Sequence, residues 1–434
     1  MGYLVNPFKY ISNKYFFVTP LFYSYGNAAE ELLWASARAK VLGRKLVVIA
    51  PARYTQILGF SICNSELFNL DFGYQFNSIE KIVKYIIVFI VNLIFFFKRL
   101  LALTLKKYFK YSLHERYFFP QIGRYSYWPA VHVNDNNLKK YGEDPILKEL
   151  LSITPPTVNL KNKTQKSAVF DELMLQIDSK YVCLHVRDFA YHSDSHKRSY
   201  RNADINNYIP AIQMLIDEGY AIIRIGDKSM QKCNFANDKF IELCKLKYQS
   251  ELLDLLIIQH CEFFIGMQSG PLDVAQLFQK PILILNMYTW FFATPFKPND
   301  RGLLKNLIIK DIGEVNSLTK RFNLPYKFTD SVEILSNEEV TFVENSPFEI
   351  LEATKLFYNE YLLEFSNELN EGMLSNRDLY RLSSKKILKN FLSFDNIRPH
   401  ENEINRIIYR ELSSFGIFYT NPSYKKKSIK NYLN

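Results

Sequence analysis

The clearest pattern of apolar and polar positions lies in the second half of the chain, where short apolar runs alternate with amphipathic segments. Residues 181–186 are β-branched and apolar enough to form a strand buried on both faces. After them, apolar residues recur at helical spacing across 205–218. The same alternation predicts further strands and helices at 221–227, 251–258, 262–266, 271–278 and 281–285. Repeated β-α units predict an α/β fold with a doubly wound parallel sheet.

A second alternation opens the chain. Residues 15–20 and 45–50 read as parallel strands on either side of a helix at 28–40, which has acids in its first turn and basic residues in its last. Gly43 ends this helix. Gly26 and Asn27 lie in the preceding loop, where glycine lets a ligand approach the backbone and Asn27 either caps the helix or binds a sugar hydroxyl.

The length of 434 residues is too great for a single core, so two domains are expected. A stretch rich in Pro, Asn, Lys and Thr at 155–166 interrupts the periodicity and indicates a linker. We predict an N-terminal Rossmann-like domain at 1–165, a C-terminal Rossmann-like domain at 166–394, and a helix with a basic tail at 395–434 that packs back on the first domain.

Residues 81–110 form a long apolar segment flanked by lysines. Its charge-free core between Lys84 and Lys98 is shorter than the roughly 20 residues that span a bilayer, so we expect that it does not cross. One interpretation is a helix lying on an anionic membrane surface, with its cations towards the headgroups. The alternatives are a buried helix or a dimer face with snorkelling lysines.

Charge and cysteine usage narrow the function classes. The formal net charge of +10 suits nucleic acid, an anionic membrane or a polyanionic substrate, but no zinc-finger spacing or RNA-binding signature accompanies it. Nucleic acid is therefore not expected as a partner. Five cysteines without a Cys-x-x-Cys pair argue against a disulfide framework or a zinc site. Without a recognisable secretory signal, the cytoplasm is the expected compartment.

Polar residues collect where the predicted strands of the second domain end. His185, Arg187 and Asp188 follow the first strand, and Gly226 with Asp227 follows the next. Because ligands of open α/β sheets bind beyond the carboxyl ends of the strands, a guanidinium at that edge suits a phosphate or diphosphate. Alternatively, His185 and Arg187 pair with acidic neighbours beneath a loop.

A turn between a strand and a helix offers a second anion site. Gly266-Met-Gln-Ser-Gly-Pro271 combines glycines and a serine at a helix start, where free backbone N–H groups bind phosphate. The same residues are also ordinary capping chemistry. Asp204 stands at a helix N-cap position.

Several motifs are missing from the sequence. It has no Walker A sequence, Gly-x-Gly-x-x-Gly, His-Glu-x-x-His or Gly-x-Ser-x-Gly, which removes the usual support for nucleotide hydrolysis, dinucleotide redox, zinc proteolysis and α/β-hydrolase chemistry. It also has no Asp-x-Asp after a strand to hold a divalent cation. We therefore expect no metal and no bound cofactor, and neutralisation of a diphosphate by protein groups.

Three separated pieces of the chain resemble the protein O-fucosyltransferase type of GT-B glycosyltransferase. They are Gly26-Asn27-Ala-Ala-Glu30, His185-Val-Arg187, and Phe264-Ile-Gly266 followed by Ser269. The strings Ser199-Tyr-Arg-Asn-Ala-Asp-Ile205, Arg224-Ile-Gly-Asp227 and Gly266-x-x-Ser-Gly270 are similar to a bacterial family of glycosyltransferases for surface polysaccharides. The resemblance implies a GT-B-like fold, with two Rossmann-type domains facing a cleft.

The resemblance also implies roles for individual residues. Arg187 would contact the donor diphosphate, and Gly26, Asn27 and Glu30 would lie on the acceptor side. The donor-binding set implied by the matched strings is His185, Arg187, Arg201, Asp204, Gly226, Asp227, Gln268, Ser269 and Gly270. Inversion at the anomeric carbon needs a general base. Glu30 is one candidate and Asp188 its competitor, while Glu30 alternatively closes a capping box with Asn27.

Together these points predict an inverting, metal-independent glycosyltransferase on the inner face of the cytoplasmic membrane. Its expected partners are a nucleotide sugar, with GDP-linked donors among the candidates, and a surface-glycan or lipid-linked acceptor. The alternative is a catalytically silent GT-B-like scaffold in polysaccharide assembly.

Overall fold

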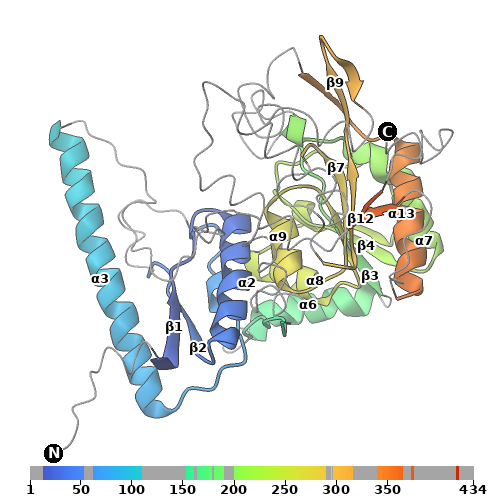
Figure 1. Cartoon of the computed structure of the whole chain (residues 1–434). Helices are drawn as coiled ribbons and strands as arrows, with labels where there is room; N and C mark the ends of the chain where they lie inside the picture. Colours follow the sequence, from blue (N-terminus) through green and yellow to red (C-terminus); the bar gives the residue numbers. More distant parts are fainter. Residues whose placement is uncertain are drawn as a thin grey trace, which may run out of the picture. The chain divides into compact units, whose positions relative to one another are not determined.

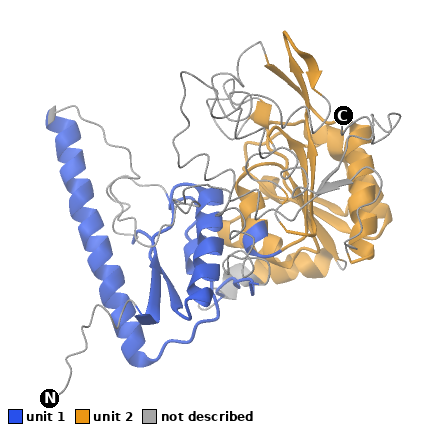
Figure 2. Cartoon of the chain, viewed as in Figure 1, with its two compact units in different colours: residues 1–129, 143–162, 276–279 blue, residues 130–142, 163–275, 280–434 orange. Residues whose placement is uncertain are grey.

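The computed structural model describes residues 13–52, 62–109, 153–160, 164–177, 180–189, 200–289, 295, 297–315, 340–364, 373–375 and 417–419. The chain divides into two compact units (Figure 2). Unit 1 comprises residues 1–129, 143–162 and 276–279, and unit 2 comprises residues 130–142, 163–275 and 280–434. The predicted C-terminal helix and basic tail lie outside the described residues, apart from the strand at 417–419.

Unit 2 is built on an eight-stranded sheet with the order β12-β13-β8-β7-β6-β3-β4-β5 (Figure 1). All neighbours in it are parallel except β12, which pairs antiparallel with β13. The strands are β3 (Tyr181–Leu184), β4 (Ala221–Arg224), β5 (Phe240–Glu242), β6 (Phe264–Gly266), β7 (Ile282–Met287), β8 (Asp300–Leu304), β12 (Met373–Ser375) and β13 (Ile417–Tyr419). Every residue of β3, β4, β6, β7 and β8 is buried, as expected for strands covered on both faces.

The strand order sets where a ligand can bind. Six parallel strands run β5-β4-β3-β6-β7-β8, which is the 3-2-1-4-5-6 order of a doubly wound nucleotide-binding sheet. The chain passes to one side of β3 first and then, from β6 onward, to the other. The crevice of such a sheet therefore lies beyond the carboxyl ends of β3 and β6.

Helices cover this sheet on both faces (Figure 1). On one face lie α7 (Ile209–Asp217) and α13 (Pro347–Leu362), which pack on each other and on strands β3, β4 and β7. On the other lie α6 (Thr164–Ile177), α8 (Glu251–His260) and α9 (Gly270–Leu277). Helix α13 begins with a capping box in which Ser346 and Glu349 bond to each other's backbone N–H groups.

The helix predicted at 205–218 is split in the structure. A 3₁₀ turn, η6 (Ile205–Tyr208), precedes α7, whose first turn holds Pro210. Proline has no N–H to donate and fits only the first turn of an α-helix, so the α-helix starts there. The predicted N-cap is confirmed, because the Asp204 side chain accepts from Asn206 N–H at 2.9 Å.

A smaller sheet, in the order β10-β9-β11, follows β8 in unit 2. Its strands β9 (Asn306–Ile309), β10 (Gly313–Val315) and β11 (Val340–Val343) are antiparallel. They enclose a small apolar cluster of their own.

Unit 1 contains the predicted β-α-β element. Strands β1 (Tyr15–Val18) and β2 (Lys45–Val48) pair in parallel and are joined through α2 (Tyr25–Val41). A 3₁₀ turn, η2 (Leu67–Asn69), follows β2. Parallel strands joined through helices in both units confirm the α/β class, and two such units in one chain agree with the predicted GT-B-like fold.

The start of α2 differs from the prediction. Its N-cap is Ser24, and the first intrahelical bond runs from Ala28 N–H to Ser24 C=O at 2.9 Å. Gly26 and Asn27 therefore lie inside the first turn, and Glu30 lies in the second. The predicted cap at Asn27, and the capping box with Glu30, are wrong because the helix begins three residues earlier. The predicted stop at Gly43 is confirmed by its φ of +61°, a conformation that favours glycine.

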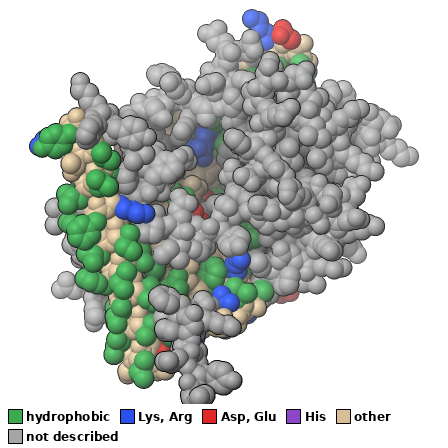
Figure 3. All heavy atoms as spheres, turned by 60° about the vertical axis from the view of Figure 1, so that its left-hand side comes forward, with side chains coloured by type: hydrophobic (Ala, Val, Ile, Leu, Met, Phe, Trp, Pro, Cys, Tyr) green, Lys and Arg blue, Asp and Glu red, His purple; other side chains and the backbone are tan. Residues whose placement is uncertain are grey.

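The apolar segment of unit 1 forms one helix, α3 (Ser78–Phe109), 32 residues long. By length and composition α3 could cross a membrane, contrary to the expectation from its charge-free core. One side of α3 packs in unit 1 through Val91, Asn92 and Phe95, while the other carries exposed apolar side chains (Figure 3).

Candidate functional site

The centre of the candidate site is a contact between the loops that follow β3 and β6. The Ser269 hydroxyl oxygen lies 3.0 Å from Nδ1 of His185. The His185 backbone N–H also donates to Ile265 C=O at 2.9 Å, which continues the pairing of the two strands to their ends. The structure therefore brings two predicted donor-binding residues together at the crevice defined by the strand order.

His185 is a neutral side chain in this environment. It is 4% exposed, and burial, followed by the nearby Arg224 and Arg187 guanidinium groups, lowers its pKa from 6.5 to about 3. At neutral pH the imidazole therefore acts as a hydrogen-bonding group and contributes no positive charge.

Gly226 belongs to the same cluster. It has φ of +147°, and a Cβ at this position would lie 2.4 Å from Met230 Sδ and 3.7 Å from His185 Cδ2. Its carbonyl oxygen accepts from Gln249 Nε2 at 2.5 Å. The positive φ would strain any other residue at 226, and a Cβ there would displace the end of the Met230 side chain, so the turn after β4 favours glycine here.

Arg201 joins the loop after β3 to the loops after β6 and β7. Its Nη2 donates to Gln268 C=O at 2.8 Å, and its guanidinium carbon lies 5.5 Å from the ring centroid of Tyr288. The residue is half-buried. These contacts orient a permanent positive charge at the carboxyl edge of the sheet.

Gln268 is engaged with the protein itself. Its Nε2 donates to Thr289 C=O at 2.8 Å, and its Oε1 accepts from the N–H groups of Tyr288 and Thr289. The side chain is 3% exposed. These bonds make Gln268 a positioning residue that holds the loop after β7 against the turn after β6.

Ser269 and Gly270 lead into helix α9. Leu272 N–H donates to Ser269 C=O at 3.0 Å, the first turn of that helix. Both residues are half-buried, so this helix start is accessible from outside the core. A helix N-terminus beside Arg201 and His185 is an arrangement suited to phosphate oxygens.

Arg187 and Asp188 lie near the start of the loop after β3, and both are buried. The Arg187 carbonyl accepts from Ala203 N–H at 2.9 Å, which fixes the return of the chain towards η6. The Asp188 carboxylate accepts from Gln231 N–H.

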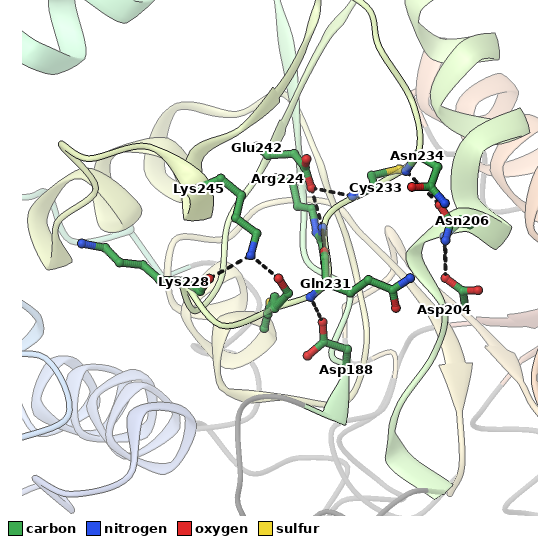
Figure 4. A network of polar contacts seen from close by, with 11 residues as sticks. Asp188, Asp204, Asn206, Arg224, Lys228, Gln231, Cys233, Asn234, Glu242 and Lys245 are labelled. Atoms are coloured by element: carbon green, nitrogen blue, oxygen red, sulfur yellow. Dashed lines mark hydrogen bonds and ion pairs between the residues drawn. The ribbon is translucent and has the colours of Figure 1, made fainter.

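Behind Asp188 lies a chain of polar contacts that reaches β5 (Figure 4). Arg224 Nη1 donates at 2.6 Å both to Gln231 C=O and to Glu242 Oε1. Arg224 is completely buried, and Glu242 faces it because the two residues pair across β4 and β5. Asp188, Gln231, Arg224 and Glu242 thus form one connected series.

Two predicted donor-binding acids have local structural contacts. Asp204 caps η6, and its backbone N–H donates to Glu344 at 2.9 Å. Asp227 is exposed and accepts from the N–H and hydroxyl of Ser229, and the hydroxyl contact is the main cause of its lowered pKa.

Lys305 is a residue that the sequence analysis did not single out. It follows β8, is 1% exposed, and donates from Nζ to Asn202 C=O. Burial lowers its pKa to about 8. Its place directly after Leu303 and Leu304 was a weak signal, because β8 begins with Asp300 and Arg301 and does not read as an apolar strand.

The predicted acceptor-side residues all lie in unit 1, on α2. Gly26 is buried, Asn27 is exposed and Glu30 is half-buried. Among the residues that the structure describes, no three His, Cys, Asp or Glu side chains cluster as metal ligands would. All five cysteines are free thiols.

Neither a protein-family model nor a curated protein sequence matches the chain. Several solved structures are similar at low identity, among them the following three. The glycosyl transferase family 9 structure from Veillonella parvula is 11% identical, over 80% of this chain and 97% of its own, with a TM-score of 0.38. The E. coli ADP-heptose lps heptosyltransferase II is 15% identical, over 81% and 100%, with a TM-score of 0.36. The S. aureus MnaA structure with UDP is 13% identical, over 82% and 99%, with a TM-score of 0.25. These values are too low to assign the chain to a family.

Proposed function

We propose that this chain is a glycosyltransferase whose nucleotide-sugar donor binds at the carboxyl edge of the unit 2 sheet. The observation that carries the proposal is the contact between His185 and Ser269 at the point where the strand order reverses. Open α/β sheets bind their ligands in that crevice.

The charges of the site favour a diphosphate. Arg201 is held at this edge by Gln268 and Tyr288, and the N-terminus of α9 adds the positive end of its dipole. Arg187 follows the same strand as His185, and its planar guanidinium can donate two parallel hydrogen bonds to phosphate oxygens. We assign Arg187 and Arg201, with the N–H groups at Ser269 and Gly270, to the donor diphosphate.

Transfer of a sugar suits this site better than redox chemistry on a dinucleotide. The turn after β3 holds His-Val-Arg-Asp in place of the glycines that let a pyrophosphate of NAD approach the first helix. The diphosphate of a nucleotide sugar is also a leaving group whose growing charge these cations would stabilise. In this proposal the cations take the place of a metal, and the reaction inverts the anomeric carbon.

The acceptor and the base belong to the same proposal. We assign the acceptor to the glycan or lipid-linked class and the general base to Glu30 of α2. Asp188 is the weaker candidate, since its carboxylate already accepts from Gln231 N–H and is 6% exposed. The expected working site is the inner face of the cytoplasmic membrane.

The test is a binding and turnover experiment with ADP, GDP, UDP, CMP and their sugar conjugates. One nucleoside diphosphate should stabilise the wild type in a thermal-shift assay. Arg187→Lys should weaken that binding roughly tenfold or more, because lysine cannot form the bidentate contact of a guanidinium with phosphate oxygens. Arg38→Lys is the matched control in unit 1, and it should bind like the wild type. Turnover should persist in EDTA.

Three outcomes would contradict the proposal. Absence of stabilisation by any nucleotide would favour a scaffold without donor binding. Binding without sugar transfer to any glycan or lipid-linked acceptor would favour a silent GT-B-like protein. Loss of turnover in EDTA with recovery in Mn²⁺ would show that acidic residues build a cation site.

A further inference from the structure

Helix α3 has two sides with opposite character, and the inward side makes it part of unit 1. The Asn92 side chain is 1% exposed; its Oδ1 accepts from Ala52 N–H at 2.7 Å, and its Nδ2 donates to Ala50 C=O at 3.2 Å. Phe95 is fully buried against the edge of Phe22, with ring centroids 5.9 Å apart. The middle of α3 is therefore anchored to the segment that follows β2.

The first turn of α3 is anchored as well. Glu80 is 3% exposed and forms ion pairs with Lys45 at 2.7 Å and Lys14 at 2.6 Å. These contacts lower the pKa of Glu80 to about 2, chiefly through Lys14 and then Lys45. The only acid of α3 is thus neutralised by unit 1.

The outward side of α3 is a continuous apolar stripe (Figure 3). Its members recur every three or four residues, which places them on one face of the helix. The outward stripe consists of Ile79, Ile82, Ile86, Phe89, Leu93, Phe97 and Leu100, which are between 39% and 73% exposed. At 1.5 Å per residue this stripe is about 30 Å long.

The cations of α3 lie away from the centre of this stripe. At about 100° per residue, Lys81, Lys84, Lys98 and Arg99 fall on the inward half of the helix. Lys81 and Lys98 are exposed there. No charged residue interrupts the outward stripe between Ile79 and Leu100.

We propose that α3 docks unit 1 on an anionic lipid bilayer, with the helix lying in the plane of the interface. The outward stripe enters the acyl region, and the long side chains of the exposed Lys81 and Lys98 extend from the other half of the helix to the phosphates of the headgroups. This surface is independent of the donor site in unit 2.

Charge decides between lipid and a second copy of the chain. A face-to-face pair of α3 helices would join only the two apolar stripes and would leave the exposed Lys81 and Lys98 of both copies without an acid of α3 to pair with, since Glu80 is already paired with Lys14 and Lys45. It would also lack the hydrogen bonds that protein interfaces form about once per 100–200 Å². A membrane with acidic headgroups supplies the missing negative charge and requires no such bonds.

The anchored middle of α3 also decides its orientation in the membrane. A spanning helix is surrounded by lipid or other spanning helices at mid-depth, whereas Asn92 holds the backbone of residues 50 and 52 against this part of α3. The helix can therefore present only its outward stripe to the acyl chains.

The test compares full-length variants in sedimentation with vesicles of phosphatidylcholine, with and without phosphatidylglycerol. The wild type should bind the anionic vesicles, and binding should fall in high salt. The triple variant Phe89→Ser, Leu93→Ser, Phe97→Ser should have a vesicle affinity at least roughly tenfold lower than the wild type, because three apolar side chains no longer enter the bilayer. Phe95 is avoided, since its replacement would open the core of unit 1.

A matched control carries Leu175→Ser, Phe348→Ser and Leu363→Ser, which are exposed apolar residues outside α3. It should bind vesicles like the wild type. Alkaline carbonate should release the membrane-bound wild type, as it does peripheral proteins.

Retention after carbonate treatment would overturn the in-plane orientation. A wild type that ignores anionic vesicles would overturn the proposal altogether. If that protein were also a dimer, and the three α3 substitutions made it monomeric, the outward stripe would be an interface between copies.

Discussion

Burial of neutral His185 gives the protein an acid-sensitive step whose size can be calculated. An unfolded histidine has a pKa of 6.5, whereas the folded state holds His185 at about 3. Because the folded pKa is the lower one, the unfolded state binds the proton first as the pH falls. Stability should therefore be intact above the unfolded pKa and be lost progressively below it.

The magnitude follows from the linkage relation at about 1.4 kcal/mol per pH unit. Between about pH 8 and pH 5, protonation of the unfolded histidine should lower the free energy of unfolding by about 2 kcal/mol, and by about 3 kcal/mol near pH 4. This is a large share of the usual stability of about 5–15 kcal/mol.

The substitution that tests this is His185→Asn, because the amide of the new side chain can still reach Ser269 but does not titrate. The variant should be less stable than the wild type at pH 8 because it leaves a cavity. The difference in unfolding free energy between the wild type and the variant should narrow by about 2 kcal/mol at pH 5, since only the wild type loses the contribution of the buried histidine.

The assay should report on unit 2 alone, because the two units need not unfold together. Hydrogen exchange of amides in β3 and β6, measured at several urea concentrations and pH values, provides this readout. Asp254 is a useful comparison because burial raises its pKa from 3.8 to about 7. Its contribution has the opposite sign, with stability lost as pH rises from 3.8 to 7, and Asp254→Asn should remove that slope. A stability gap between wild type and His185→Asn that stays constant from pH 8 to 5 would refute the assignment of a buried neutral histidine.

Two further predictions concern the acids around the proposed site. Glu242→Gln should destabilise unit 2 by about 3–5 kcal/mol in urea unfolding, because it leaves the fully buried Arg224 guanidinium without its carboxylate, whereas Glu242→Leu combined with Arg224→Met should cost much less. An unchanged midpoint for Glu242→Gln would mean that water reaches Arg224. Glu30→Gln should lower kcat by roughly 10² with little change in donor binding if Glu30 is the general base. The neighbouring Glu31→Gln is its control, because the Glu31 carboxylate accepts from a backbone N–H of unit 1 and its loss should affect stability instead of turnover. Normal turnover in Glu30→Gln together with an inactive Asp188→Asn would move the base to unit 2.

The strands and helices that flank the donor edge could be predicted from sequence because their patterns are local. Strand β3 can be recognised from the four consecutive residues that are buried in it. The turn before α9 can likewise be recognised from the short string Gly-Met-Gln-Ser-Gly. The start of α2 could not be predicted as well, since Ser24 and Asn27 are both good caps and the choice depends on the backbone path between them.

The contacts that position the site were not predictable for a different reason. Arg224 faces Glu242 only because β4 and β5 pair in one register, and β5 is a three-residue strand with little signal of its own. The role of Gln268 likewise depends on where the loop after β7 returns. Such long-range pairings are properties of the assembled sheet, and a single sequence does not contain their distances.

The link from Glu242 to Asp188 has a consequence for how the chain tolerates substitution. β5 is the last strand at its edge of the sheet, a place where most side chains can change freely. Glu242 is an exception, since it balances the charge of Arg224, which in turn holds the carbonyl of Gln231. In a library of random variants, position 242 should therefore accept as few residues as a core position, while exposed Lys239 nearby accepts nearly any.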